Sequence, residues 1–132
     1  MIGKAEENSL EKAKELQVRT KSFALRIIKM FRSLPNSAEA GIIGRQVLRS
    51  GTSVAANYRA VCRARSKPEF TAKLGVVVEE ADETVFWLEL LVESGVVSEE
   101  GLRGLMKEAN ELLAIFAASR HTARRGVKRS DH

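Results

Sequence analysis

The segment GRQVLRSGTSVAANYRAVCRAR, residues 44–65 of this 132-residue sequence, carries the clearest structural pattern in the chain. Apolar or small residues recur along it at alternating steps of four and three, which predicts a long helix with one buried face. That stripe consists of Val47, Gly51, Val54, Tyr58 and Val61. A neighbouring series with the same steps contains Arg45, Arg49, Arg59 and Arg63. No Asp or Glu occurs between residues 39 and 69, so the second series predicts a basic stripe.

The predicted first helix spans residues 9–34 and follows residues 1–8, which we expect to be frayed. Its apolar residues also recur at steps of four and three, so one face is predicted to be buried. Pro35 cannot continue this helix, and either Asn36 or Ser37 is placed to cap a second helix over residues 38–64. Small side chains in the second helix predict the close approach of another helix. They are Ser50, Gly51, Thr52, Ser53, Ala55 and Ala56.

Two further helices follow in the sequence. Ser66 and Glu69 match the S-x-x-E capping box, whose reciprocal hydrogen bonds open a helix. Gly95 is placed to take the left-handed conformation that ends this third helix. Ser98 then caps a fourth helix, whose apolar pattern stops near residue 119. Residues 120–132 are predicted to form a disordered basic tail.

The order of these helices predicts an all-α fold. Short connections make consecutive helices antiparallel, so residues 9–119 are expected to form one up-down-up-down four-helix bundle domain. No apolar run approaches the roughly 20 residues of a membrane span, and no secretory signal pattern opens the chain. We therefore expect a cytoplasmic protein without membrane contact.

Opposite charges are predicted on the second and third helices, although the whole chain has a net charge of +5. The third helix is rich in acids, namely Glu69, Glu79, Glu80, Asp82, Glu83, Glu89 and Glu93. The simplest arrangement pairs the two helices through guanidinium and carboxylate groups, within one chain or between subunits. The candidate partners are Arg49, Arg59, Glu79 and Glu83. Either such pairs occupy the arginines of the basic stripe, or those arginines remain available to bind phosphate.

The sequence offers little chemistry for catalysis. Its only histidines, His121 and His132, lie in or beside the tail, and no Glu-x-x-His motif for a di-metal site occurs. Neither a phosphate-binding loop nor a glycine-rich dinucleotide motif is present. The single cysteine, Cys62, is interpreted as a small buried apolar residue beside the core stripe. We therefore predict a protein that is not an enzyme and that uses no metal or cofactor.

Three segments of the chain together resemble one bacterial family. They are RQVLRSGTSVAANYRA at residues 45–60, SKPEFTAKL at 66–74 and EEADETVFWLELL at 79–91. They are similar to the four-helix bundle proteins encoded by open reading frames in intervening sequences of 23S ribosomal RNA. The residues that match the family's helix-two pattern are Gln46, Arg49, Ser53, Val54 and Asn57.

The resemblance implies a homo-oligomer, typically a pentamer arranged as a ring, with no known catalytic activity. A related branch, the accessory proteins of diversity-generating retroelements, has a similar fold. It works with a reverse transcriptase and nucleic acid through a basic surface.

Charge and resemblance together lead to the hypothesis of weak binding to structured RNA or DNA, without base specificity. The candidate binding residues are Arg45, Arg49, Arg59, Arg63, Arg120, Arg124, Arg125, Lys128 and Arg129. The alternative is a protein-protein interaction scaffold without nucleic-acid binding, whose ring presents a surface to an unidentified protein partner.

Overall fold

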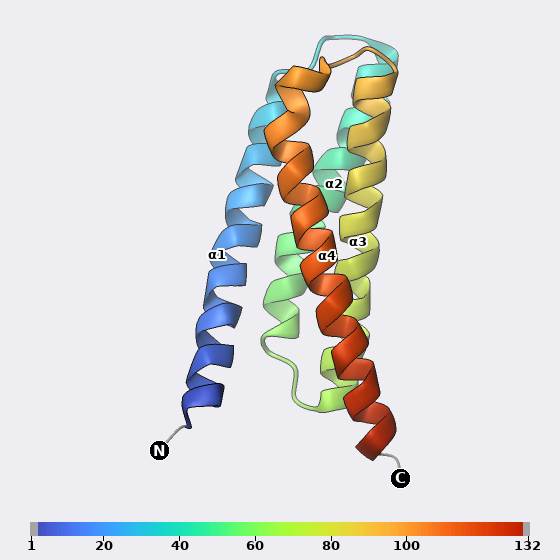
Figure 1. Cartoon of the computed structure of the whole chain (residues 1–132). Helices are drawn as coiled ribbons and strands as arrows, with labels where there is room; N and C mark the ends of the chain where they lie inside the picture. The colour runs from blue at the N-terminus through green and yellow to red at the C-terminus, as the bar shows by residue number, and fades with distance from the viewer. Residues whose placement is uncertain (1–2, 131–132) are drawn as a thin grey trace.

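The computed structural model describes residues 3–130, and for residues 127–130 it describes only the helical backbone. Four helices make up this part of the chain: α1 Lys4–Arg32, α2 Ala38–Val61, α3 Lys67–Glu93 and α4 Glu99–Ser130. No strand occurs between residues 3 and 130. Figure 1 shows consecutive helices running in opposite directions, so that the first and last helices have their free ends at the same end of the molecule. The predicted all-α four-helix bundle is confirmed.

Contacts between the helices are uneven around the bundle. The α2–α3 contact is the most extensive, followed by α3–α4 and α1–α2, whereas α1 and α4 touch only slightly. Where α1 diverges from α4, a groove of about 840 Å³ lies between them. Its lining includes Leu16, Tyr58 and Ile115. The bundle therefore consists of three consecutive antiparallel helix pairs, and only a small α1–α4 contact closes it.

The buried core follows the predicted stripes. Val47, Gly51, Val54, Tyr58 and Val61 are all buried on α2, as their spacing predicts. Phe23 and Ile27 on α1, together with leucines and valines of α3 and Phe116 of α4, complete one continuous apolar cluster. Since α3 packs against both α2 and α4, it contributes two sets of buried residues.

Small residues on α2 bring α1 close, as the sequence predicts. A Cβ atom added at Gly51 would lie only 2.9 Å from Cγ1 of Ile27, and one added at Gly44 would lie 2.5 Å from Cδ1 of Leu34. A side chain at Gly51 would force Ile27 or the two helices to shift, whereas at Gly44 the flexible end of Leu34 would have to move aside. The glycines therefore reduce helix propensity in exchange for closer packing between α1 and α2.

Serine residues cap three of the helices. The Ser37 hydroxyl accepts a hydrogen bond from the Ala40 amide at 3.3 Å, and Ser98 accepts one from the Gly101 amide at 3.1 Å. Ser66 likewise accepts from the Glu69 amide at 3.1 Å, but the Glu69 carboxylate accepts from the Arg65 amide, one residue before the cap. A φ of +80° at Gly95 provides the predicted left-handed end of α3.

The helices differ from the prediction at three ends. Helix α1 begins at Lys4, within the segment expected to be frayed, and α4 continues to Ser130 through most of the expected disordered tail. Acidic residues in the first turn of α1 and the absence of proline after Glu111 favour these extensions. Helix α2 ends earlier, at Val61. Consequently Cys62 is the C-cap residue and is exposed, so its prediction as a buried residue is wrong.

Candidate nucleic-acid interface

The four arginines of the predicted basic stripe are all exposed. Arg45, Arg49 and Arg59 lie on α2 itself, and Arg63 lies in the turn that follows the C-cap. Arg49 is the member of this stripe that has ion-pair partners; among the described side chains, Arg45, Arg59 and Arg63 contact no carboxylate within salt-bridge distance. Three of the four cations of the stripe are therefore exposed and, among the described side chains, unpaired.

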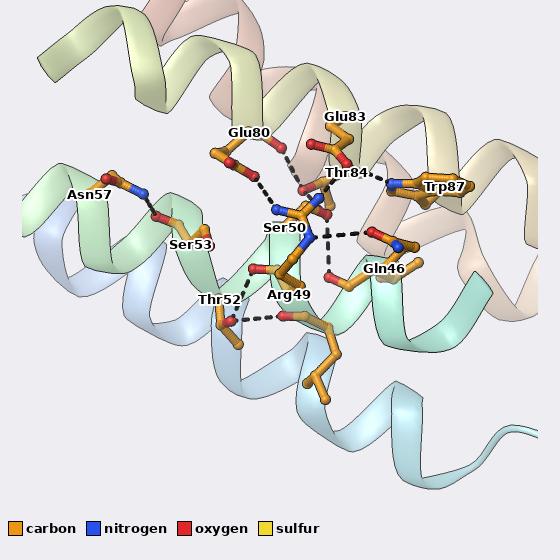
Figure 2. Close-up of polar contacts among 12 residues, drawn as sticks. Gln46, Arg49, Ser50, Thr52, Ser53, Asn57, Glu80, Glu83, Thr84 and Trp87 are labelled. Atoms are coloured by element: carbon orange, nitrogen blue, oxygen red, sulfur yellow. Dashed lines mark hydrogen bonds and ion pairs between the residues drawn. The ribbon is translucent and has the colours of Figure 1, made fainter. Parts of the chain in front are cut away.

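Arg49 bridges α2 and α3 (Figure 2). Its Nη1 atom lies 3.2 Å from Oε2 of Glu80, and its Nη2 atom donates to the Glu83 carboxylate. The Nε atom donates to Oε1 of Gln46 at 3.2 Å, one turn earlier on the same helix. The hydrogen bond to Glu83 is the main reason that the pKa of Arg49 is raised. Each of the three nitrogen atoms of this guanidinium thus donates a hydrogen bond within the chain.

Glu83 receives a second donor from its own helix. Trp87 Nε1 donates to Oε1 of Glu83 at 3.1 Å, one turn along α3 (Figure 2). This bond, followed by the bond from Arg49, holds the pKa of the Glu83 carboxyl below its usual value. The Trp87 ring also meets the ring of Phe86 edge to face, with centroids 5.0 Å apart. The indole is therefore committed to contacts on α3.

Two residues predicted to form ion pairs do not meet. The structure brings Arg49 to Glu83, but Arg59 and Glu79 have no ion-pair partner among the described residues. Glu80 takes the place expected for Glu79, because burial of Ala81, Thr84 and Leu88 fixes the rotation of α3. Glu79 consequently points to solvent while Glu80 is half-buried.

Beneath this cluster lies a polar contact that the periodicity did not reveal. Ser50 on α2 and Thr84 on α3 are both fully buried, and their hydroxyl oxygens lie 2.9 Å apart. Thr84 Oγ1 also lies 2.7 Å from the carbonyl oxygen of Glu80, so the hydroxyl can donate within its own helix. Thr84 lies among the buried apolar residues of α3, and Ser50 lies next to Gly51 of the α2 core stripe, which was the available signal.

A second basic group gathers where α4 passes α3. Arg120, His121, Arg124 and Arg125 line a pocket of about 420 Å³ together with Val78 and Ala117. Arg124 and Arg125 are exposed, and Arg120 is half-buried. The side chains of Lys128 and Arg129, also predicted to bind nucleic acid, lie outside the described residues.

The remaining ion pairs lie elsewhere on the surface. Arg19 on α1 holds Glu108 and Glu111 on α4, each at 2.6 Å, and Lys73 lies 2.9 Å from Glu69 within α3. The hydrogen bond from Arg19 lowers the pKa of the Glu108 carboxyl.

No group of three or more His, Cys, Asp or Glu residues is arranged to hold a metal ion within the described chain. None of the four helices, as far as residues 3–130 define them, is long and apolar enough to cross a membrane.

Comparisons with known proteins identify similar chains. Residues 14–118 match the model of a family described as 23S rRNA-intervening sequence protein. A crystal structure of a protein of unknown function from Bacteroides thetaiotaomicron, assigned to the S23 ribosomal protein family, has a similar fold with a TM-score of 0.77. The two chains are 30% identical over 83% of this chain and 98% of the other. A comparison with curated protein sequences finds no match.

Proposed function

Because the chain belongs to the 23S rRNA-intervening sequence protein family, we propose that it is a non-enzymatic protein that binds structured RNA or DNA through basic surfaces. The exposed and unpaired state of Arg45, Arg59 and Arg63 is the observation that carries this proposal. Cations that contact no carboxylate keep their full attraction for phosphate and release counterions when they bind it. Arg49 is left out of the binding surface, because its donors already serve Gln46, Glu80 and Glu83.

Binding of this kind follows shape and charge rather than base sequence. Arg45 and Arg59 are 14 positions apart on a straight helix, a separation of about 21 Å. Such a row can follow one strand of phosphates, and contacts to phosphate carry no base-sequence information. We therefore place the protein among backbone binders, with affinity that decreases steeply as salt concentration rises.

The proposal includes self-assembly into a ring-shaped homo-oligomer, for which a pentamer is the favoured size. Support comes from large apolar side chains that the single chain leaves exposed. Val18 is 71% exposed, Ile42 63% and Phe86 50%. A second copy that covered these side chains would stabilise the assembly in proportion to the apolar area removed from water. A ring would also repeat the basic stripe and so multiply weak phosphate contacts.

The direct test measures binding of a labelled structured RNA and a matched duplex DNA by fluorescence anisotropy across a salt series. The test variant replaces Arg45, Arg59 and Arg63 by Gln, and the control replaces Lys14, Lys21 and Lys29 on α1, which are also exposed. Loss of three phosphate contacts should reduce the slope of log affinity against log salt by about 2 to 3 in the test variant only. Equal losses in both variants, or no binding by the parent chain, would contradict the proposed surface. Light scattering on all three proteins tests the oligomer.

The second candidate function is a protein-protein interaction scaffold without nucleic-acid binding. The exposed Phe86 and Ile42 side chains favour it, since aromatic and aliphatic anchors dominate protein interfaces. A protein partner that remains bound after nuclease treatment, and that is lost in Phe86→Ala, would support the scaffold. We propose a cytoplasmic location for either function.

A further inference from the structure

The pocket between α3 and α4 differs from the α2 stripe because its cations converge. Its α4 residues stand at positions 117, 120, 121, 124 and 125, which share one helix face because they are separated by alternating steps of three and one. Val78 of α3 forms the opposite wall. Three guanidinium groups and one imidazole thus border one space of about 420 Å³.

Arg120 is held against the backbone of α3. A Cβ atom added at Gly75 would lie 3.1 Å from Nε and from Nη2 of Arg120, and 3.2 Å from its Cζ. Glycine at this position therefore gives the guanidinium the room that it occupies. The contact fixes the position of a side chain that would otherwise sample many rotamers at the surface.

One donor of this positioned guanidinium lacks an acceptor. Among the buried side-chain nitrogen and oxygen atoms of the described residues, Arg120 Nε is the one without a hydrogen-bond partner. Leaving a buried donor unsatisfied lowers the stability of the fold, and more so when the group is charged. Buried donors without a partner are rare in native structures, and those that occur commonly have a functional role.

No carboxylate neutralises the pocket from its own lining residues. Glu69 is the single acid in residues 67–78 of α3, and it pairs with Lys73. On α4 no acid follows Glu111 within the described residues. Glu79 is exposed and is not among the residues that line the pocket. The local field is therefore positive on the α4 side.

We propose that this pocket is a discrete binding site for one phosphate group, with Arg120 as its fixed anchor and Arg124 and Arg125 as mobile partners. Guanidinium groups match the oxygen spacing of a phosphate and form charge-assisted hydrogen bonds to it. The phosphate can belong to a nucleic-acid backbone or to a free phosphorylated molecule. The first source rests on the proposed function, whereas the site itself does not.

The test titrates inorganic phosphate into the full chain at constant ionic strength, with chloride as the compensating anion. Binding is followed by the ¹⁵N-resolved Nε–H signal of Arg120 and by calorimetry. A site with a Kd of about 1 mM is nearly saturated at about 10 mM phosphate. We expect a saturable shift of the Arg120 signal in the parent chain. Arg120→Gln should weaken phosphate binding about tenfold or more, the effect of losing one strong charged contact.

Two further variants separate the site from general charge. Gly75→Ala keeps every cation but requires the Arg120 guanidinium to shift by a few tenths of an ångström, so it should weaken phosphate binding less than Arg120→Gln does. Arg103→Gln removes an exposed cation from α4 outside the pocket and should leave binding within about twofold. Equal weakening by Arg103→Gln and Arg120→Gln, or no saturable shift in the parent chain, would overturn the site.

The same variants are then measured with the labelled RNA. A loss of RNA affinity in Arg120→Gln that Arg103→Gln does not share identifies the nucleic-acid backbone as the phosphate source. Phosphate binding without any RNA binding by the parent chain rejects the proposed function but retains the site, with a free phosphorylated molecule as its ligand. RNA binding without a phosphate-dependent signal rejects the site and retains the proposed function.

Discussion

The α2–α3 and α1–α4 interfaces each contain one arginine that holds two carboxylates. Arg49 reaches Glu80 and Glu83 across the first, and Arg19 reaches Glu108 and Glu111 across the second. The packing below them differs. The first interface is the most extensive in the molecule and covers a buried pair of hydroxyl groups. The second is the smallest and borders an open groove.

The difference separates two contributions that are often combined. Similar ion pairs form at the extensively packed α2–α3 interface and at the sparsely packed α1–α4 interface. The ion pairs therefore do not determine how closely the helices approach. Exposed pairs contribute at most about 1 kcal/mol, whereas one fully buried leucine contributes several times more. The apolar and small residues of α2 and α3 therefore determine how closely these helices approach. The arginines form ion pairs with the carboxylates that this packing brings within reach.

A matched pair of leucine truncations tests this comparison with the largest effect. Leu88 on α3 is fully buried, whereas Leu16 on α1 lies half-buried at the groove. Leu88→Ala should lower the free energy of unfolding by about 2–5 kcal/mol, since it leaves a closed cavity. Leu16→Ala should cost less than half as much, because water can enter the space. Urea denaturation measures both, and equal losses would show that the groove is closed in solution.

Two buried threonines provide the next test. Thr84 contacts Ser50 across the α2–α3 interface, whereas Thr20 on α1 bonds to the Leu16 carbonyl oxygen of its own helix at 2.7 Å. Thr84→Val leaves the Ser50 hydroxyl with only the Val47 carbonyl oxygen, at 3.4 Å, and should cost about 1 kcal/mol. Thr20→Val should be close to neutral. A cost for Thr20→Val as large as that for Thr84→Val, by thermal denaturation, would remove the distinction.

The two arginines differ in their control of carboxylate protonation. The pKa of Glu108 is lowered chiefly by Arg19, whereas that of Glu83 is lowered first by Trp87 and then by Arg49. A lowered folded pKa gives stability above the ordinary pKa of Glu, and that stability is lost as pH falls through the folded pKa. Arg19→Gln should therefore raise the pKa of Glu108 more than Arg49→Gln raises that of Glu83.

Carboxyl titration by NMR gives both values directly. Each substitution should lower the free energy of unfolding near pH 7 by about 0.2–1 kcal/mol, and less at high salt. The acid-induced loss of stability should become shallower, mainly in Arg19→Gln. An equal pKa change in the two variants would show that the Trp87 bond adds nothing to Glu83.

The smallest effect is expected at the end of α2, beside the groove. Cys62 is exposed at the C-cap, so Cys62→Ser should change the free energy of unfolding by less than about 0.5 kcal/mol. The folded protein should react with a thiol reagent without prior denaturation. Labelling only after denaturation would mean that the groove side of the bundle is covered in solution.

Much of the fold could be predicted from local patterns. The 4-3 spacing of Val47 to Val61 fixes which face of α2 is buried, and Ser66 with Glu69 fixes where α3 begins. These features depend on residues within a few turns of one another, which the sequence displays directly. The family resemblance added the assignment that the comparisons confirm.

Details that depend on the rotation of one helix against another could not be predicted. The choice of Glu80 over Glu79 as partner for Arg49 depends on how far α3 is turned by its buried Ala81 and Thr84. The exposure of Cys62 depends on α2 ending one residue before it. The positioning of Arg120 depends on Gly75, 45 positions earlier in the sequence, which no pattern of spacing connects to it.

The order of the helix contacts has a consequence for how the chain folds. Each extensive contact joins helices that are consecutive in the sequence, and the one contact between the first and last helices is slight. The helix hairpins can therefore form one after another. Each requires the closure of only a short loop, so little conformational entropy is lost before its helix contacts form. We expect folding in microseconds to milliseconds. Helix α1 should be the first to lose amide protection during local opening, because its contacts with the other helices are the least extensive of the four.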